Sequence, residues 1–365
     1  MRILNNILVT GGAGFIGNNF IRFLFGETSV KPDFKGRIIN LDTLTYAGNA
    51  ESLKTIDDKY GQERYFFENG DINDKNKVEE IFLKYNIDTV INFAAESHVD
   101  RSILGPEAFV KTNILGTFTL LECARTFWRQ DDGSFADGVL FHQISTDEVY
   151  GSLSETGSFT ETTPYNPRSP YSASKAASDH LVMAYHHSYG LPITLSNCSN
   201  NYGPYQFPEK LIPLMVLNML EGNSLPVYGD GKNIRDWLYV EDHNNGLWTI
   251  LQNGKAGEKY NIGGENEWEN IKLLNLLIDI VAKKTGKDAE KINGTISFVK
   301  DRPAHDRRYS IDCSKIKREL GWKLNVKFEE GLERTVDWYL GNTGWVNSVR
   351  TGEYRNWMEK NYTGR

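Results

Sequence analysis

The hydrophobic positions of the first 200 residues fall into two alternating kinds of segment. Short runs rich in β-branched and apolar residues predict buried strands, at Ile7–Thr10, Arg37–Leu41, Arg64–Glu68, Thr89–Phe93, Val139–Ser145 and Ile193–Asn197. Longer amphipathic stretches predict helices between them, at Phe15–Phe25, Asn76–Tyr85, Phe109–Trp128 and Ser172–Tyr189. Strands that alternate with helices form βαβ units, which predicts an α/β fold whose parallel sheet is covered by helices on both faces.

The pattern changes after about residue 200, where prolines punctuate the chain and the apolar runs become short. This texture is typical of a smaller α+β lobe. One later segment, Trp237–Leu251, has a strand pattern followed by a helix pattern, and we expect it to return to the sheet. We therefore predict a Rossmann-type doubly wound domain from residues 1–200 plus about 237–262, and a C-terminal substrate lobe from about 201–236 and 263–365.

The composition narrows the classes of protein that remain. The 365 residues are 39% hydrophobic and 24% charged, which is typical of a soluble globular chain. The net charge, 41 − 48 = −7, argues against a nucleic-acid partner. Cys123, Cys198 and Cys313 form no CxxC pair, so we expect neither a disulfide framework nor a metal site. The sequence has no run of about 18 apolar residues, which predicts no membrane span and a cytoplasmic location.

The first predicted strand leads directly into a glycine-rich turn and then into a predicted helix. A strand that turns sharply into a helix, and lets a pyrophosphate approach its backbone, needs glycines because side chains would obstruct both. The helix N-terminus then offers N–H groups and a positive dipole end to the phosphates. The residues that we expect to bind a dinucleotide here are Gly11, Gly14, Phe15, Ile16 and Gly17.

A carboxylate after the second strand indicates which dinucleotide binds. Asp42 directly follows the strand Arg37–Leu41. A carboxylate at such a strand end accepts hydrogen bonds from the adenosine ribose and repels a 2′-phosphate, which favours NAD over NADP. Asp71 and Ile72 follow the next strand and are placed to meet the adenine ring. The alternative for Asp42 is an ordinary turn residue at a strand end.

A tyrosine and a lysine four residues apart suggest a proton-transfer pair. Tyr171 and Lys175 open a predicted helix just after Pro170, and the i, i+4 spacing places them on one helical face. A nearby ammonium stabilises phenolate, so we expect it to lower the pKa of Tyr171 and make this tyrosine a base for a sugar hydroxyl. Lys175 could also hold the nicotinamide ribose. The alternative is an amphipathic helix with a solvated lysine.

Two adjacent carboxyl groups, Asp147 and Glu148, follow the strand that ends near Ser145-Thr146. Oxidation of a hydroxyl needs only the tyrosine–lysine pair and a hydroxyl partner. Dehydration of a hexose needs more: one group removes a proton next to a carbonyl, and another protonates the departing hydroxyl. The pair fits dehydration, although Asp-Glu pairs also cap helices, and spacing alone does not separate the two readings.

Several motifs together resemble those of the dTDP-glucose 4,6-dehydratases, in the extended short-chain dehydrogenase/reductase superfamily. They are Gly11–Gly17, Ala94–Ser102, Thr146-Asp147-Glu148, Tyr171–Lys175, Asn200–Pro204, Pro208–Pro213, Arg235-Asp236-Trp237 and Asp301-Arg302-Pro303. The resemblance spans nearly the whole chain, including the tail around Trp345–Tyr362. Ala304 departs from it, because the family usually has glycine there. The segments Gly26–Gly36 and Gln130–Gly138 resemble surface loops of variable length.

The resemblance assigns further residues to the two ligands. Besides the residues above, it implies NAD contacts from Phe93, Ala94, Ala95, Ser97, Thr112 and Asn201. It implies nucleotide-sugar contacts from Ser97, Thr146, Asn200, Lys210, Leu211, Pro226, Val227, Tyr228, Arg235, Asn270, Asp301, Arg302 and His305. The basic members of this set could gather around a diphosphate despite the acidic total.

The resemblance also implies a reaction and an assembly. Thr146, Asp147, Glu148, Tyr171 and Lys175 would be the catalytic residues of a lyase that converts dTDP-glucose to dTDP-4-keto-6-deoxyglucose and water through bound NAD. A homodimer is implied as well, with the stretches Phe109–Trp128 and Ser172–Tyr189 meeting their symmetry mates.

Two alternatives remain open from the residues alone. An epimerase, a decarboxylase or another dehydratase, acting on a UDP-, GDP- or CDP-hexose, would share the glycine turn and the tyrosine–lysine pair. A catalytically silent NAD-binding scaffold would need neither Tyr171 and Lys175 nor the two carboxyl groups. The residues do not determine the base of the nucleotide.

Overall fold

The computed structural model describes residues 1–303, 305–350, 354 and 356. Its largest sheet is parallel throughout and has the order β10-β6-β5-β4-β1-β2-β3. The strands of this sheet are β1 (Asn6–Thr10), β2 (Arg37–Asp42), β3 (Tyr65–Asn69), β4 (Thr89–Asn92), β5 (Leu140–Thr146), β6 (Ile193–Cys198) and β10 (Glu258–Ile262). The six strands predicted in the first half are all present, so the predicted Rossmann-type α/β fold is confirmed.

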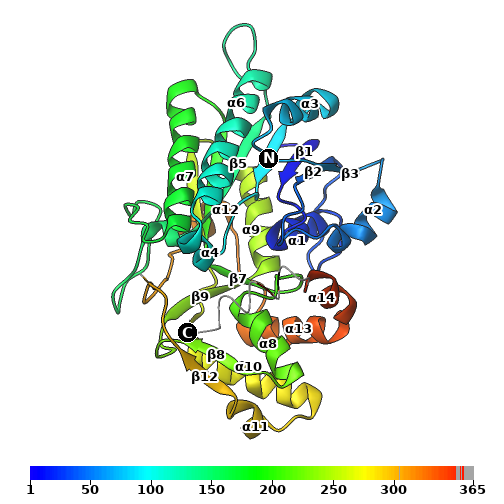
Figure 1. Cartoon of the computed structure of the whole chain (residues 1–365). Coiled ribbons are helices and arrows are strands. Elements are labelled where there is room, and N and C mark those ends of the chain that lie inside the picture. Colours follow the sequence, from blue (N-terminus) through cyan, green and yellow to red (C-terminus); the bar gives the residue numbers. More distant parts are fainter. Residues whose placement is uncertain (304, 351–353, 355, 357–365) are drawn as a thin grey trace.

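Two groups of helices cover the two faces of this sheet (Figure 1). The helices are α1 (Phe15–Leu24), α9 (Val240–Asn253) and α12 (Ser314–Leu320) on one face, and α3 (Lys75–Tyr85), α6 (Thr117–Trp128) and α7 (Pro170–Tyr189) on the other. Side chains alternate along each strand, so Ile7 and Val9 of β1 pack in the first core and Leu8 packs in the second. Both faces are buried, which explains why the strands read as continuous apolar runs.

Shorter helices complete the upper domain. They are η1 (Ala50–Leu53), α2 (Lys54–Tyr60), α4 (Val99–Leu104), α5 (Glu107–Phe109), η2 (Val110–Gly116) and η3 (Asp147–Tyr150). The predicted helix Phe109–Trp128 is therefore one continuous helical path whose middle part, η2, is a π-helical segment. η1 and α2 were not predicted, because their short polar turns carry little apolar periodicity.

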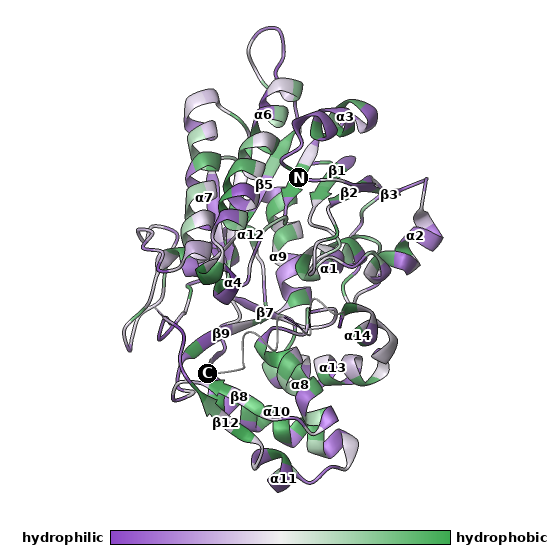
Figure 2. Cartoon of the chain, in the orientation of Figure 1, coloured by the Kyte–Doolittle hydropathy of each residue, from purple (hydrophilic) through white to green (hydrophobic). Residues whose placement is uncertain are grey.

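The remaining strands and helices form a lobe below the main sheet in Figure 1, around a third core. Its elements are β7 (Asn200–Tyr202), β8 (Leu225–Tyr228), β9 (Ile234–Tyr239), β11 (Glu267–Glu269), β12 (Ile296–Val299), α8 (Leu211–Glu221), α10 (Asn270–Thr285), α11 (Ala289–Asn293), α13 (Phe328–Gly341) and α14 (Thr343–Val349). The apolar residues of α8 and α10 and the main-sheet strands stand out as the most hydrophobic segments of the chain (Figure 2).

One sequence-based prediction about this region is wrong in part. The strand at the start of Trp237–Leu251 does not return to the main sheet: it belongs to β9, in a small sheet of order β11-β9-β7. The helix of that segment, α9, does pack on the main sheet beside α1, and β10 is the strand that joins the edge next to β6. A four-residue apolar run pairs equally well in either sheet, so its pattern could not decide between them.

The fold places a cleft where the strand order reverses. The chain runs outward from β1 to β2 and β3 on one side, and from β4 to β5 and β6 on the other. Loops leaving β1 and β4 diverge at this switch point and leave a crevice at the carboxyl ends of the strands. The departure at Ala304, and the part of the C-terminal tail that lies at 351–353, 355 and 357–365, fall outside the described residues.

Candidate active site

The glycine-rich turn between β1 and α1 forms one end of this cleft. Gly11 has a φ of 69°, and a Cβ added there would lie 2.7 Å from the backbone of Ala94 at the end of β4. A Cβ at Gly17 would lie 2.4 Å from the carbonyl oxygen of Gly11. Any side chain at either position would therefore push the turn, β4 and α1 apart. The first turn of α1 lines the cleft, where its N–H groups and dipole favour a phosphate.

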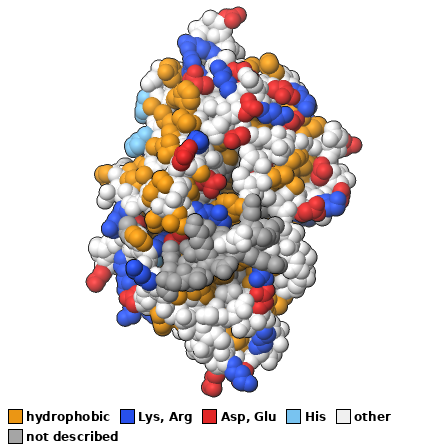
Figure 3. Space-filling view, viewed as in Figure 1, with side chains coloured by type: hydrophobic (Ala, Val, Ile, Leu, Met, Phe, Trp, Pro, Cys, Tyr) orange, Lys and Arg blue, Asp and Glu red, His pale blue; other side chains and the backbone are white. Residues whose placement is uncertain are grey.

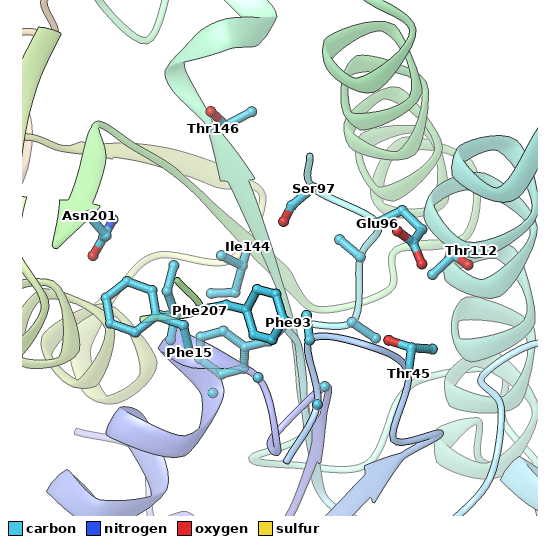
Figure 4. Close-up of a pocket in the computed structure, with 18 of the residues that line it drawn as sticks. Phe15, Thr45, Phe93, Glu96, Ser97, Thr112, Ile144, Thr146, Asn201 and Phe207 are labelled. Carbon is cyan, nitrogen blue, oxygen red and sulfur yellow. The ribbon is translucent and has the colours of Figure 1, made fainter. Parts of the chain in front are cut away.

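The cleft continues over the ends of β2, β4, β5 and β7. Its predicted lining residues are Gly11, Gly14, Phe15, Ile16, Gly17, Asp42, Asp71, Ile72, Phe93, Ala94, Ala95, Ser97, Thr112, Thr146, Glu148, Tyr171, Lys175, Asn200, Asn201 and Lys210. Figure 4 shows the rings of Phe15, Phe93 and Phe207 close together on one side of the cavity, with Ser97 and Thr146 nearer its other end. The cleft therefore has an apolar part beside a part rich in hydroxyl and carboxyl groups.

Asp42 has the turn role that the sequence offered as the alternative, and its ribose-binding role stays a prediction. Its Oδ2 accepts a hydrogen bond from the N–H of Ala13 at 2.9 Å, and its Oδ1 accepts one from the N–H of Leu44 at 2.8 Å. It is thus a turn residue that ties the glycine turn to the loop after β2. Its carboxyl group also lines the cleft, where a ribose would meet it.

The two carboxyl groups lie at the end of β5 in different surroundings. Thr146 Oγ1 accepts a hydrogen bond from the N–H of Glu148 at 3.3 Å, so Thr146 caps η3. The same hydroxyl donates to Oδ1 of Asp147 at 3.2 Å. Oδ2 of Asp147 is buried and has no hydrogen-bond partner among the described residues. The capping role is therefore performed by threonine, which leaves both carboxyl groups available for chemistry.

Burial and charge give the two carboxyl groups different acidities. Burial raises the pKa of Asp147 well above its ordinary value, and the negative charge of Glu148 raises it further. Burial also raises the pKa of Glu148, but the positive charges of Arg302, Arg235 and Lys210 oppose that shift. Asp147 is therefore the better proton donor and Glu148 the better proton acceptor at neutral pH.

Tyr171 and Lys175 lie in the first turns of α7. Ser169 and Ser172 form a capping box at its start and Pro170 is the first helical residue, which fixes where the helix begins. Both side chains are buried, and Lys175 Nζ donates to the carbonyl oxygen of Ile144 at 2.7 Å. The helix thus holds both groups against the end of β5.

The expected direction of the Tyr171 pKa is not what the structure shows. Burial raises the pKa of Tyr171 well above its ordinary value, the negative charge of Glu148 adds to that shift, and a hydrogen bond with Thr146 opposes it. Burial lowers the pKa of Lys175, while the charge of Asp179 raises it. The spacing correctly placed the two residues on one face, but it does not indicate how deeply that face is buried.

Basic residues from the lobe reach the same carboxyl groups. Arg235 on β9 is buried, donates from Nη2 to the carbonyl oxygen of Asp306 at 2.9 Å, and lies 4.4 Å from the ring centroid of Tyr309. Lys210 Nζ donates to the carbonyl oxygen of Ser97 at 3.1 Å. With Arg302, these groups place positive charge near Glu148 and lower its pKa; the diphosphate site predicted from them stays a prediction.

Ten of the predicted residues do not line the cleft itself. They are Asp147, Leu211, Pro226, Val227, Tyr228, Arg235, Asn270, Asp301, Arg302 and His305. Most belong to the lobe: Pro226–Tyr228 lie on β8, Asn270 begins α10, and His305 Nδ1 pairs with Asp301 beside the ring of Tyr228. The members from the lobe lie beyond the lining of the cleft, and a nucleotide that contacts them must extend from the cleft into the lobe, whereas Asp147 directly follows β5.

Sequence reasoning missed other residues that line the cleft. They are Leu41, Thr43, Thr45, Ala47, Gly48, Gly70, Ile144, Ser145, Cys198, Ser199, Gln206, Phe207 and Glu209. Several directly follow predicted strands, and that position is the signal that could have found them. Phe207 and Glu209 come from a loop after β7, and nothing in their local pattern indicates that the loop folds over the cleft.

Comparisons with known proteins find relatives that match nearly the whole chain. The GDP-mannose 4,6 dehydratase family profile matches residues 8–335. The dTDP-glucose 4,6-dehydratase of Escherichia coli is 54% identical and covers 98% of this chain and 99% of its own length. The chain belongs to the dTDP-glucose 4,6-dehydratase family. The resemblance seen in the sequence motifs is therefore confirmed.

Solved structures place the family among its neighbours. The dTDP-glucose 4,6-dehydratase of Streptomyces venezuelae, solved with NAD bound, has a TM-score of 0.83 and 46% identity over 94% of this chain and 99% of its own. The UDP-glucose 4-epimerase of Thermotoga maritima, solved with UDP-glucose, has a TM-score of 0.79 but 29% identity, over 93% and 99%. The fold is shared by both enzymes, and the higher sequence identity favours the dehydratase.

Proposed function

We propose that this protein converts dTDP-glucose to dTDP-4-keto-6-deoxyglucose and water, with NAD held throughout the cycle. The observation that carries the proposal is the pair of adjacent carboxyl groups at the end of β5, Asp147 and Glu148, whose surroundings give them opposite proton-transfer roles. An epimerase needs no such acid beside its tyrosine and lysine. The high identity to dTDP-glucose 4,6-dehydratases supports the same substrate.

The cleft fits NAD on its own geometry. A side chain at Gly11 or Gly17 would collide with neighbouring backbone, so both positions need glycine, as a turn whose backbone is approached by a pyrophosphate does. Asp42 lies where a ribose would sit and would repel a 2′-phosphate. When bound, NAD would accept the hydride from C4 and, once reduced, would donate it to C6.

The protein's own groups perform the proton transfers. Tyr171 accepts the proton of the C4 hydroxyl, while Thr146 orients the C4 oxygen. The C4 ketone that results acidifies the C5 proton, which Glu148 removes. Asp147, protonated at that stage, donates a proton to the C6 hydroxyl, which leaves as water. Glu148 then returns its proton to C5.

Lys175 supports Tyr171 and holds the nicotinamide ribose in this proposal. The lobe, about 201–236 with 263–365, binds the nucleotide part of the substrate. Lys210, Arg235 and Arg302 are its candidate diphosphate ligands, because all three surround Glu148 with positive charge.

The proposal includes a homodimer in the cytoplasm. Large hydrophobic side chains are exposed along the path from α4 to α7, at Ile103, Leu104, Val110, Leu115, Phe118 and Tyr189. Figure 3 shows hydrophobic side chains gathered over these helices on one face. Burying such a surface against its symmetry mate would form a four-helix contact. Light scattering at micromolar concentration should give twice the chain mass, and a stable monomer would contradict it.

No helix among the described residues is long and apolar enough to cross a membrane.

A substrate panel tests the proposed activity. Purified protein is incubated with dTDP-, UDP-, GDP- and CDP-glucose, and the products are followed by the absorbance of the 4-keto sugar in alkali and by mass spectrometry. We expect a product 18 mass units lighter, the mass of one water, from dTDP-glucose. A product of unchanged mass, with inverted C4, would support an epimerase instead.

A further inference from the structure

Asp179 is a buried acid that the proposed reaction has not used. It lies one helical turn beyond Lys175 on α7 and is 1% exposed. Its Oδ2 accepts hydrogen bonds from Ser145 Oγ at 2.6 Å and from Tyr165 Oη at 3.1 Å. Its Oδ1 has no hydrogen-bond partner among the described residues. It does not line the cleft, so no direct contact with cofactor or substrate explains it.

Lys175 needs a negative partner at this position. Its side chain is 4% exposed, and its Nζ donates a hydrogen bond to the neutral carbonyl of Ile144. A buried ammonium is costly unless an opposite charge accompanies it. Burial lowers the pKa of Lys175, and two groups oppose this shift. Asp179 has the larger effect and Cys198 the smaller one. In turn, the charge of Lys175 lowers the pKa of Asp179 against burial.

Other groups face Asp179 from neighbouring elements. Lys259 on β10 has its Nζ 4.6 Å from the ring centroid of Tyr165 and lies near enough to Asp179 to lower its pKa. The charge of Asp179, after burial and the charge of Glu161, also raises the pKa of Tyr150 in η3. His180 shares with Asp179 a small second cavity, which has no lining residue in common with the cleft. Lys259, Tyr150 and His180 do not line the cleft, whereas Lys175 does.

We propose that Asp179 is a positioning residue: one helical turn beyond Lys175, its buried carboxylate keeps Lys175 protonated, so that Lys175 can support Tyr171 as the base. Ser145 and Tyr165 hold the carboxylate through its Oδ2. Ser145 directly precedes Thr146 on β5, so the same short segment fixes both the counter-charge and the catalytic hydroxyl. This assignment of Asp179 rests on the proposed function of Lys175.

The substitution Asp179→Asn separates the charge from the shape. Asparagine keeps the size and an oxygen that can accept from Ser145, but removes the negative charge facing Lys175. The pKa of Lys175 should then fall, because an opposite charge at close range raises it by about one unit or more. Lys175 would lose its proton at a lower pH, so the alkaline limb of kcat should move to lower pH by about one unit, a tenfold fall in kcat on that limb. The KM should change little, because Asp179 does not line the cleft.

Asp242→Asn is the matched control. Asp242 is also a buried carboxylate, but it accepts hydrogen bonds from the backbone of Asn325 and Val326 and does not line the cleft. Its loss should lower the thermal unfolding midpoint without moving the pH profile. Both variants are purified with bound NAD, and their NAD content and circular dichroism are compared with those of the wild type.

Two readouts decide the proposal. The pH profile of kcat with dTDP-glucose should shift in Asp179→Asn and not in Asp242→Asn. The 13Cε chemical shift of Lys175, assigned by its loss in Lys175→Arg, reports the lysine pKa without substrate and should show the same downward shift. An unchanged Lys175 pKa would overturn the proposal, as would a loss of activity that only parallels loss of NAD or of fold. If the wild type makes no product from dTDP-glucose, the proposed function fails, while the chemical shift still decides whether Asp179 holds the charge of Lys175.

Discussion

The hydroxyl of Thr146 donates a hydrogen bond to Oδ1 of Asp147 at 3.2 Å. The same oxygen caps η3 by accepting from the N–H of Glu148, and it also hydrogen-bonds Tyr171. One hydroxyl at the end of β5 therefore contacts both Tyr171, the proposed base for the C4 hydroxyl, and Asp147, the proposed acid for the departing C6 hydroxyl. Its position explains how oxidation and dehydration can share one site.

Replacing Thr146 should affect both stability and turnover. Thr146→Val keeps the shape of the side chain but removes the cap, which should lower the free energy of unfolding by about 0.5–2 kcal/mol. The carboxyl group of Asp147 loses its hydrogen bond as well, so kcat should fall by at least about tenfold. Urea unfolding and product assays measure the two effects. Thr146→Ser, which keeps the hydroxyl, is the control, and equal losses in both variants would contradict the role of the hydroxyl.

The carboxylate of Asp42 should determine the choice of dinucleotide. The purified protein should release NAD and no NADP on denaturation, because Asp42 lies where the 2′-phosphate of NADP would be repelled. Chromatography of the released nucleotide measures this preference. Asp42→Ala should bind NAD more weakly, because the loops tied through Ala13 and Leu44 loosen as well. Bound NADP in the wild-type protein would contradict the assignment.

The main sheet was predictable because its strands are buried on both faces, which leaves apolar runs such as Ile7–Thr10. The glycine turn was predictable for a local reason, since Gly11 and Gly17 lie where no Cβ fits. Trp237 was misplaced because the pairing partner of β9 is decided by distant strands, which the segment itself does not encode.

The chemistry of the site was less predictable than its position. Burial raises the pKa of Tyr171 and lowers the pKa of Lys175, which makes the charge of Asp179 important to Lys175. The extent of burial depends on how α7 packs against β5. Phe207 reaches the cleft from a loop whose path is fixed by contacts with Tyr46 and Tyr354, far away in the sequence. Side-chain spacing carries no information about such contacts.

A buried histidine should make the fold sensitive to acid. Burial lowers the pKa of His142 to about 3, and the positive charge of Arg2 adds to the shift. Because the unfolded chain, with an ordinary histidine pKa near 6.5, binds the proton more readily, this contribution to stability is complete above pH 6.5 and is lost as the pH falls toward 3. The loss is at most about 1.4 kcal/mol per pH unit in that window.

The contribution of His142 is measured by difference. In His142→Asn, the loss of unfolding free energy between pH 7 and pH 5 should be smaller than in the wild type by about 1–2 kcal/mol. Buried acids with raised pKa act in the opposite direction, but they are common to both proteins and cancel. His187→Asn, a change at an exposed position of α7, is the control and should leave the wild-type pH dependence unchanged. Equal losses in His142→Asn and the wild type would rule out His142 as the source.

In the proposed mechanism, Asp147 and Glu148 perform the dehydration while Tyr171 and Lys175 perform the oxidation. The double variant Asp147→Asn, Glu148→Gln keeps size and hydrogen bonding but removes both the acid and the base, which should slow dehydration by at least about 10²–10⁴-fold. Tyr171→Phe, the matched control, should block the earlier step.

The decisive measurement is the absorbance of reduced nicotinamide after purified enzyme is mixed with dTDP-glucose, alongside an assay of the 6-deoxy product. The double variant should accumulate reduced cofactor and form almost no 6-deoxy product, whereas Tyr171→Phe should show neither. If the double variant instead turns over at nearly the wild-type rate, the two carboxyl groups do not carry out the dehydration, and the proposed mechanism is wrong.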